Sequence, residues 1–385
     1  MHTTLPLTEN NISCHSATAG RSVNANAKDG YDKPHKKIII PNVLARWPWP
    51  RRLSPFYPEV SAASTAWIAG LKAFSPKAQE AFERGDFGLC ACLAYPTARK
   101  EHVRAGCDYI NAVFVIDEYS DVSGEHEVRK QKDIVMDALR NPHKPRPDGE
   151  WIGGEVHRQW VFCYLIFNIK TYTTDRFWER SIPHATAQGQ KRFIMAYDEY
   201  LEGVVQEAID RDQHLVRDIQ SYTEVRRRTI GVGQIFALLE LGLDIPDEVW
   251  LHPAIIDMVT AAYDMSFLTN DYVSYNLEQA RGDAIHNIVT IVMHEFDTDI
   301  NGAMEKFLRA KADVPKWGET IDSQVMEYCE GVGNWVRGHD DWGFESGRYL
   351  GSKGLEIKRK GWMSLLPKEG PRESAVGPVL VGSLL

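Results

Sequence analysis

Long apolar runs and zinc-type cysteine spacing are both missing from the sequence. No apolar run approaches the roughly 18 residues that a membrane-spanning helix requires, so we expect no membrane span. Six cysteines are scattered over 385 residues without the CxxC or Cys/His spacing of a zinc site. Because no signal-peptide pattern precedes them, we expect reduced thiols in a cytoplasmic protein.

Positive charge is also scarce. The chain has 44 Lys and Arg against 53 Asp and Glu, a net charge of −9, which argues against a nucleic-acid partner. An anionic ligand would therefore need cations to mediate its binding. The composition, 43% hydrophobic and 25% charged, is that of a globular protein with a sizeable core, built as one large domain or two smaller ones.

The first 36 residues differ from the rest of the chain. Residues 1–36 are rich in Asn, Ser, Thr, Gly and Lys and poor in large apolar side chains, which predicts a disordered extension. A targeting peptide is the weaker alternative, since Glu9 and Asp29 are acidic and no Arg-rich amphipathic pattern is present. Beyond residue 36, aromatic side chains between prolines predict an N-terminal strap packed on the body.

From about Ala62 onward the pattern is helical. Apolar residues recur three and four positions apart and strand alternation is scarce, which predicts an all-α fold. Ser75-Pro76 is typical of an N-cap followed by proline at the first helical position. Neither an internal repeat nor a domain boundary interrupts residues 40–355. The predicted helical segments include 62–74, 75–87, 104–119, 127–140, 188–212 and 234–246.

Three acids follow the apolar run 111–116. Asp117 and Asp121 are four apart and share one helix face, whereas Glu118 points about 100° away. Two carboxylates at this spacing can hold Mg²⁺, which prefers oxygen ligands and keeps waters and substrate phosphate oxygens in its shell. The alternative is a solvated helix end. The apolar run before the pair favours the mouth of a buried pocket.

A second set of oxygen donors lies near residue 270. Asn270, Ser274 and Glu278 fall at i, i+4 and i+8, so an amide, a hydroxyl and a carboxylate share one helical face. They form a plausible chelate for a single cation, with Asp271 and Arg281 beside it.

Two basic clusters fit an anionic ligand. Arg226, Arg227 and Arg228 precede a glycine pair that should break the helix at Gly231 and Gly233. Three arginines in a row are otherwise a solvated face.

Near the end of the chain, Arg348 and Tyr349 offer a guanidinium beside a phenol donor. Such a pair is also common on protein surfaces. Combined with the two acidic sets, the basic clusters predict a site for a cation-bound polyphosphate.

In this order along the chain, these motifs resemble those of class I terpene synthases. Asp117-Glu118-Tyr-Ser-Asp121 is similar to the aspartate-rich motif, Asn270 to Glu278 to the NSE motif, and Arg348-Tyr349 to the RY pair. The likeness spans residues 37–355. It implies a single-domain helical bundle with a central cavity that binds three Mg²⁺ ions, or Mn²⁺, and farnesyl diphosphate, as a monomer or homodimer.

The resemblance also implies metal ligands. Asp117 would bind two of the cations, with Asp121 supporting them less directly. Asn270, Ser274 and Glu278 would bind the third.

It further implies which groups contact the substrate. Arg226 best matches the arginine that senses the diphosphate, and Arg227 is the alternative. Arg348 and Tyr349 would hydrogen-bond the diphosphate, and Trp342 matches an aromatic residue that walls the pocket.

The chemistry constrains the rest of the pocket. Ionisation leaves a carbocation, so we expect a dry wall without nucleophiles, in which aromatic faces stabilise the charge. Phe114, one turn before Asp117, is a candidate lining residue, with ordinary core packing as the alternative. Many relatives carry lysine before the NSE glutamate, where this chain has Leu277. We expect Arg281, one turn on, to take part of that role.

A narrower likeness concerns the product. The stretches "IIIPNVLARWPWPRRLSPFYPEV" and "VMDALRNPHKPRPDGEWIGGEV" resemble fungal sesquiterpene synthases of the clade that makes protoilludene and related 1,11-cyclised products. The implied reaction passes through a humulyl cation, and 1,10 closure to germacrene- or cadinene-type products is the alternative. Residues 356–385 would form a C-terminal tail.

One segment departs from the family pattern. In relatives the equivalent of "EVHRQ" continues into "FWER", whereas residues 160–176 intervene here. We expect a retained intron, with a lineage-specific loop as the alternative.

Two other function classes share parts of this pattern. A trans-prenyltransferase would carry a second aspartate-rich motif in place of Asn270 to Glu278. A catalytically inactive helical binding protein would keep the architecture, but every motif residue is present here.

Overall fold

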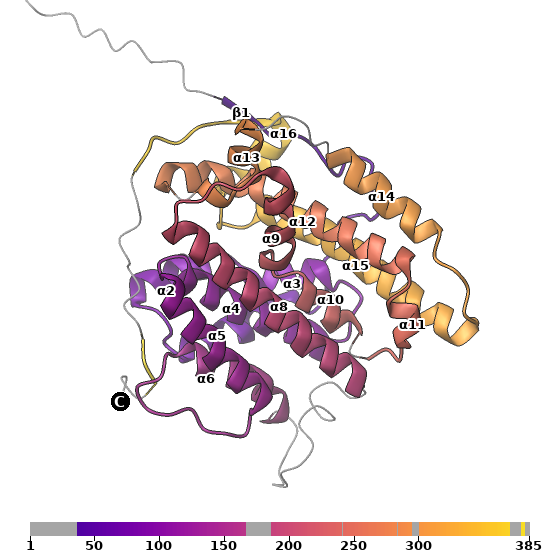
Figure 1. Cartoon of the computed structure of the whole chain (residues 1–385), viewed down its shortest axis with the longest axis horizontal. Helices are drawn as coiled ribbons and strands as arrows, with labels where there is room; N and C mark the ends of the chain where they lie inside the picture. Colours follow the sequence, from indigo (N-terminus) through magenta and orange to yellow (C-terminus); the bar gives the residue numbers. More distant parts are fainter. Residues whose placement is uncertain are drawn as a thin grey trace, which may run out of the picture. The chain divides into compact units, whose positions relative to one another are not determined.

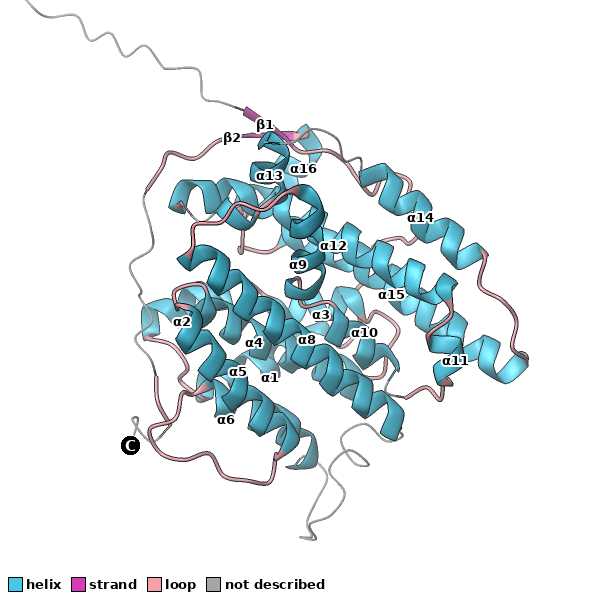
Figure 2. Cartoon of the chain, in the orientation of Figure 1, coloured by secondary structure: helices cyan, strands magenta, loops and turns pink. Residues whose placement is uncertain are grey.

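The computed structural model describes residues 37–166, 186–240, 242–282, 284–294, 300–369 and 379–381. Most of the described chain is helical and strands are few (Figure 2), which confirms the all-α prediction. Residues Lys36–Leu385 form one compact unit. None of the described helices has the length and apolar character of a membrane span. The extension predicted at 1–36 lies outside the described residues.

Figure 1 shows the order of the elements along the chain. The first half contains β1 (Lys37–Ile39), α1 (Tyr57–Gly70), α2 (Pro76–Glu83), α3 (Phe87–Ala94), α4 (Lys100–Ser120), α5 (Glu125–Arg140), α6 (Gly153–Ile166) and α8 (Ala187–Asp212). The second half contains α9 (Ile219–Thr229), α10 (Gly233–Glu240), α11 (Asp247–Trp250), α12 (Pro253–Arg281), η1 (Ala284–His286), α13 (Ile288–His294), α14 (Ile300–Ala312), α15 (Glu319–Glu345), η2 (Gly351–Lys353), α16 (Gly354–Lys360) and β2 (Trp362–Ser364).

The helix α3 lies at the centre of the core. It is apolar on every face and buried along its whole length, because it packs against α1, α4 and α15. Its N-cap is Asp86, whose Oδ1 accepts a hydrogen bond from the backbone N–H of Leu89 at 3.1 Å. A Cβ on Gly338 of α15 would lie 2.6 Å from the backbone of Leu93, so glycine is needed where α15 crosses α3.

The predicted helices are present with shifted ends. Ser75 caps α2 as expected, its Oγ accepting from the N–H of Ala78 at 3.3 Å, and Pro76 occupies the first helical position. The helix predicted at 62–74 instead ends at Gly70, and Lys72 has a left-handed φ of 50°. The segment predicted at 234–246 is helical in α10 only as far as Glu240.

The strap predicted after residue 36 is confirmed. Strand β1 pairs antiparallel with β2 near the other end of the chain. The indole of Trp47 donates to the carbonyl of Gly333 on α15 at 3.0 Å, and the guanidinium of Arg337 donates to the carbonyls of Leu44 and Trp49 at 2.9 and 2.8 Å. These bonds fasten the strap along α15.

The described parts of 356–385, the segment expected as a C-terminal tail, pack onto the body. Beyond α16 and β2, the backbone N–H groups of Gly149 and Ile152 donate to the carbonyls of Val381 and Val379, both at 2.9 Å. The tail therefore contributes contacts to the fold.

The segment suspected as an insertion, 160–176, is described only in part. Its first seven residues continue α6 to Ile166, and the remainder lies outside the described residues. Trp160 is only 4% exposed and packs against Tyr109 and Phe193 at ring-centre distances of 5.7 and 5.3 Å. Trp160 is therefore a core residue. That residues 160–176 come from a retained intron stays a prediction.

Candidate active site

A cavity of about 220 Å³ lies between α4, α8, α9, α12 and α15. All ten side chains predicted for the site line it. They are Phe114, Asp117, Asp121, Arg226, Asn270, Ser274, Glu278, Trp342, Arg348 and Tyr349. We call Asp117 and Asp121 the α4 wall, and Asn270, Ser274 and Glu278 the α12 wall.

The α4 wall is neutralised by one arginine. The Nη2 of Arg348 lies 2.8 Å from Oδ2 of Asp117, and its Nη1 pairs with Oε1 of Glu118. Glu118 therefore contacts the same guanidinium although helical periodicity directs it away from the aspartates. Partial loss of hydration inside the cavity raises the pKa of Asp117, and Arg348 opposes this rise. The pKa of Arg348 is raised by Glu118 and Asp117 even though burial lowers it.

Asp121 lies where α4 ends. It is the C-cap residue, and the turn after it is held by Arg211 of α8, whose Nη2 donates to the carbonyls of Ser120 and Ser123 at 2.6 and 3.3 Å. Enclosure and the neighbouring Asp117 carboxylate raise the pKa of Asp121 well above its ordinary value.

Glu207 and Arg211, one turn apart on α8, also line the cavity. Neither residue was predicted from the sequence. Their spacing places them on one helix face, but an exposed ion pair gives the same pattern.

The α12 wall presents its donors on one helix face, as predicted. The Nδ2 of Asn270 donates to the hydroxyl of Tyr349 at 2.9 Å, and its Oδ1 accepts from Nη2 of Arg226 at 2.8 Å. The α12 wall is thus already connected to two groups predicted to contact the diphosphate. Burial raises the pKa of Glu278 to about 7, although hydrogen bonds from Ser274 and Asn287 lower it.

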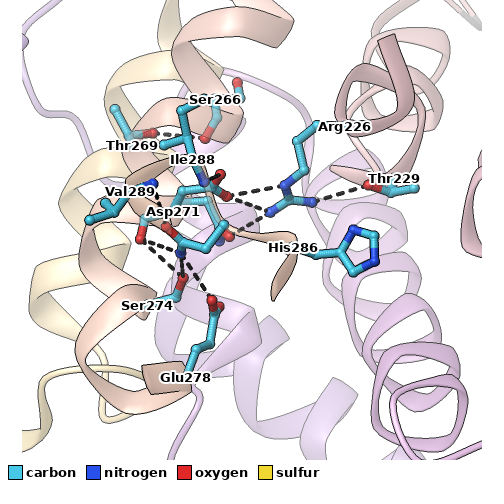
Figure 3. A network of polar contacts seen from close by, with 12 residues as sticks. Arg226, Thr229, Ser266, Thr269, Asp271, Ser274, Glu278, His286, Ile288 and Val289 are labelled. Atoms are coloured by element: carbon cyan, nitrogen blue, oxygen red, sulfur yellow. Dashed lines mark hydrogen bonds and ion pairs between the residues drawn. The ribbon is translucent and has the colours of Figure 1, made fainter. Parts of the chain in front are cut away.

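Asp271 supports the α12 wall from behind (Figure 3). Its side chain is only 1% exposed and does not line the cavity. Its Oδ1 accepts from Nε and Nη2 of Arg226 at 3.1 and 3.0 Å, and its Oδ2 accepts from the hydroxyl of Tyr222 and, at 2.9 Å, from the N–H of Ile288. Burial raises the pKa of Asp271, and Arg226 opposes the rise.

Asn287, just before α13, is a second supporting residue that the sequence analysis missed. It is fully buried, and its Nδ2 donates to the carbonyl of Asp271 at 2.8 Å and to Oε2 of Glu278 at 2.9 Å. The Oγ of Ser274 lies 3.4 Å from the same nitrogen. No sequence signal marks Asn287, because its partners come together only when the chain turns back after α12.

The three arginines of the triplet lie in different environments. Arg226 lines the cavity, whereas Arg227 forms a bidentate pair with Asp264 at 2.6 and 2.8 Å and Arg228 is exposed. The predicted helix break is confirmed, since α9 ends at Thr229 and Gly231 adopts a left-handed φ of 69°. Sequence spacing left Arg226 and Arg227 as alternatives, and the geometry places only Arg226 in the cavity lining.

Phe114 and Trp342, the predicted aromatic residues, both pack against core residues and line the cavity. Phe114 stacks on Phe87 with ring centres 4.1 Å apart and also lines the cavity. The guanidinium carbon of Arg348 lies 4.9 Å from the centre of the Phe114 ring. Trp342 is 1% exposed, and its indole donates to the carbonyl of Gly85 at 2.8 Å.

The expectation of a wall without nucleophiles is wrong. Cys90 of α3 and His339 of α15 both line the cavity. Burial raises the pKa of the Cys90 thiol well above its ordinary value, so it remains a neutral thiol, which is a weak nucleophile. Sequence alone could not reveal this, because it does not tell which buried side chain faces a cavity.

The donors suit a hard divalent cation. No three His, Cys, Asp or Glu side chains converge on one point in the described part of the chain. The cavity instead offers a carboxylate pair on one wall and an amide, a hydroxyl and a carboxylate on the other. Such partial, all-oxygen sets fit Mg²⁺, which completes its shell with waters and phosphate oxygens.

Comparison with known proteins gives close relatives. The chain is 54% identical over 358 residues to a Delta(6)-protoilludene synthase of Stereum hirsutum, covering 90% of this chain and 92% of the relative. It is 52% identical over 357 residues to a Delta(6)-protoilludene synthase of Armillaria gallica, covering 90% and 98%. A sesquiterpene synthase of Postia placenta is 44% identical over 348 residues, covering 88% and 94%.

Solved structures share the fold. The linalool/nerolidol synthase of Streptomyces clavuligerus superimposes with a TM-score of 0.63 at 20% identity, covering 79% of this chain and 99% of that one. A cucumene synthase variant gives 0.62 at 19% identity, covering 77% and 98%. The family model described as terpene synthase family 2, C-terminal metal binding, matches residues 108–310. With this match and the close relatives, the chain belongs to the terpene synthase family and depends on divalent metal.

Proposed function

We propose that this protein is a Mg²⁺-dependent sesquiterpene synthase that ionises farnesyl diphosphate and cyclises the resulting cation. The observation that carries the proposal is that two oxygen-rich walls, two arginines and an aromatic lining share one cavity. The names of the relatives, sesquiterpene and protoilludene synthases, support the substrate class.

At the polar part of the cavity, the α4 wall would hold two Mg²⁺ ions through Asp117 with help from Asp121, and the α12 wall would hold the third. Bound Mg²⁺ supplies positive charge that stabilises the diphosphate as it leaves. Arg226, Arg348 and Tyr349 donate hydrogen bonds to the diphosphate oxygens.

The arginines also balance the walls before substrate arrives. Arg348 is paired with Asp117 and Glu118, and Arg226 bonds Asn270 and Asp271. Charged groups that are already paired cost less to keep in an enclosed cavity. When a Mg²⁺-bound diphosphate enters, the two guanidinium groups exchange these partners for phosphate oxygens.

The apolar lining controls what happens to the cation. As the C–O bond breaks, its electron pair leaves with the diphosphate, and a distal double bond of the substrate attacks the allylic cation. The faces of Phe114, Trp335 and Trp342 stabilise positive charge without forming a bond to it. We propose that the first ring closure joins C1 to C11, giving a humulyl cation on the way to a protoilludene-type tricycle.

The test is incubation of the protein with all-trans farnesyl diphosphate and Mg²⁺, followed by gas chromatography of a hexane overlay. A protoilludene-type hydrocarbon is expected, and it should disappear when a chelator removes Mg²⁺. Mainly germacrene- or cadinene-type products would overturn 1,11 closure while keeping the synthase. Absence of any hydrocarbon from folded protein would overturn the synthase and favour a binding protein of the same fold.

A further inference from the structure

His339 lines the cavity and is held in one orientation. It lies on α15, one turn before Trp342, and is 7% exposed. Its ring stacks on Trp335 with centres 5.3 Å apart at an interplanar angle of 29°, and it lies 5.8 Å from the ring of Trp342 at 39°. The indole of Trp335 is itself fixed by a 3.2 Å hydrogen bond to Oγ of Ser266.

The shorter of two hydrogen bonds at Thr269 favours one tautomer of His339. The hydroxyl of Thr269 donates its one hydrogen to the carbonyl of Ser266 at 2.9 Å (Figure 3). The same oxygen lies 3.4 Å from Nδ1 of His339, and while Thr269 donates to Ser266 it accepts from Nδ1. In this arrangement Nδ1 carries the hydrogen and Nε2 carries a lone pair.

Nε2 is open to the cavity. Among the described residues it has no hydrogen-bond partner, yet it is not one of the polar atoms sealed inside the protein. The other histidine that lines the cavity, His286, differs because its Nε2 is sealed and unpartnered. Burial lowers the pKa of His339 to about 4, so the ring is neutral near pH 7 and the lone pair is available.

A bare nitrogen is a hazard in a cavity where a carbocation forms, because it can be alkylated. It is also a group that can end the reaction by accepting a proton, since a cyclisation to a hydrocarbon must finish with proton loss. A weak base suffices, because a proton beside a cationic carbon is far more acidic than an imidazolium ion. The faces of Trp335 and Trp342 would stabilise the imidazolium through cation–π attraction.

We propose that His339 is the terminating base of the cyclisation. This rests on the proposed function and names a further catalytic residue for it. Nε2 takes a proton from a carbon next to the last cationic centre. The electron pair of that C–H bond becomes the π bond of the product alkene, and the proton forms an imidazolium that returns it to water when the product leaves.

The test compares His339→Phe and His339→Gln with wild type. Phenylalanine keeps a flat ring between the two indoles but has no lone pair, and glutamine keeps a polar group. For both we expect diphosphate release within about threefold of wild type. The main hydrocarbon should fall by roughly tenfold or more relative to total products, replaced by alkenes from earlier cations or by water-quenched alcohols. His102→Gln, a histidine outside the cavity lining, is the matched control and should keep the product profile.

An unchanged product profile in either folded variant would overturn the proposal, as would an equal loss of diphosphate release and of the main product in both, which marks a structural role. If neither variant folds, the test is Thr269→Val, which keeps the imidazole and removes the hydroxyl that contacts Nδ1 and the carbonyl of Ser266. It should shift products in the same direction, and an unchanged profile would overturn the base. Failure of the wild type to convert farnesyl diphosphate would instead overturn the proposed function.

Discussion

The α4 wall and the α12 wall line one cavity, yet their oxygen donors are held in different ways. The side chain of Asp117 is 38% exposed, and its ion-pair partner is Arg348, which comes from beyond the far end of α15. On the α12 wall, Ser274 is 2% exposed, and behind it lie the buried residues Asp271 and Asn287. One wall is open and balanced by an exchangeable arginine, and the other is fixed by an inner layer of hydrogen bonds.

The difference suggests a division of labour between the walls. Buried hydrogen bonds fix the orientation of the metal-binding side chains before a cation arrives. The hydrogen-bond partners of metal ligands do the same in metal sites generally. An open carboxylate paired with arginine can change partners when a cation and a diphosphate enter together. We therefore expect the α12 wall to depend on residues that touch no ligand, and the α4 wall to depend on its own carboxylates.

The largest effect should come from removing a donor from either wall. Asp117→Ala and Asn270→Ala are each expected to lower turnover on the order of 10³-fold, because each deletes an oxygen that binds a cation needed for ionisation. Helix content measured by circular dichroism should stay unchanged. Retained activity in both variants would show that the walls are not the metal site.

Arg226→Ala should have the next largest effect. Loss of a charge-assisted donor to the diphosphate should lower kcat/KM roughly 10- to 100-fold. Arg228→Ala, in the same triplet but exposed, is the matched control and should stay within about twofold of wild type. Equal losses in the two variants would mean that the register of the triplet is wrong.

Asn287→Ala tests the inner layer directly. Its amide bonds Glu278 and the backbone of Asp271, so its loss should weaken the apparent Mg²⁺ affinity roughly 10- to 100-fold, and excess Mg²⁺ should restore much of the rate. The measurement is turnover against Mg²⁺ concentration. Asn111→Ala on α4 also removes a buried amide, one that bonds Ser64 and the carbonyl of Cys107, and should lower stability without changing the Mg²⁺ requirement.

The smallest effect on turnover concerns the helices that support both walls. His157 of α6 is fully buried and bonds the carbonyl of Gly153 and the hydroxyl of Tyr197, both at 2.7 Å. Burial lowers the pKa of His157 to about 4. Its neutral form is thus favoured by folding, so its contribution is complete above pH ~6.5 and is lost as pH falls towards 4, by up to about 3 kcal/mol.

Thermal melts between pH 7.5 and 4.5 should show Tm falling over this window. His157→Gln should have a shallower fall, with part of the slope remaining because burial lowers the pKa of His102 and His339 in the same direction. A slope identical to that of wild type would mean that His157 is not titrating. Turnover per folded molecule at pH 7.5 should not change in His157→Gln. This result would distinguish a residue that stabilises the helices from one that acts in the α4 or α12 wall.

Much of the site could be predicted from the sequence because it depends on helix periodicity. Spacings of four fixed which side of α4 carries Asp117 and Asp121, and which side of α12 carries Asn270, Ser274 and Glu278. The Ser75-Pro76 cap and the break at Gly231 are equally local, since each is decided by a few neighbouring residues. These features came from the chain's own geometry and needed no knowledge of packing.

The contacts between distant segments depend on the tertiary structure. Arg226 rather than Arg227 enters the cavity because α9 packs against α12 in one orientation. Asn287 reaches Glu278 because the chain turns back after α12, and His339 of α15 lines the cavity beside the residues of α4 and α12. Periodicity tells which residues share a face, but only the packing of whole helices decides what that face meets.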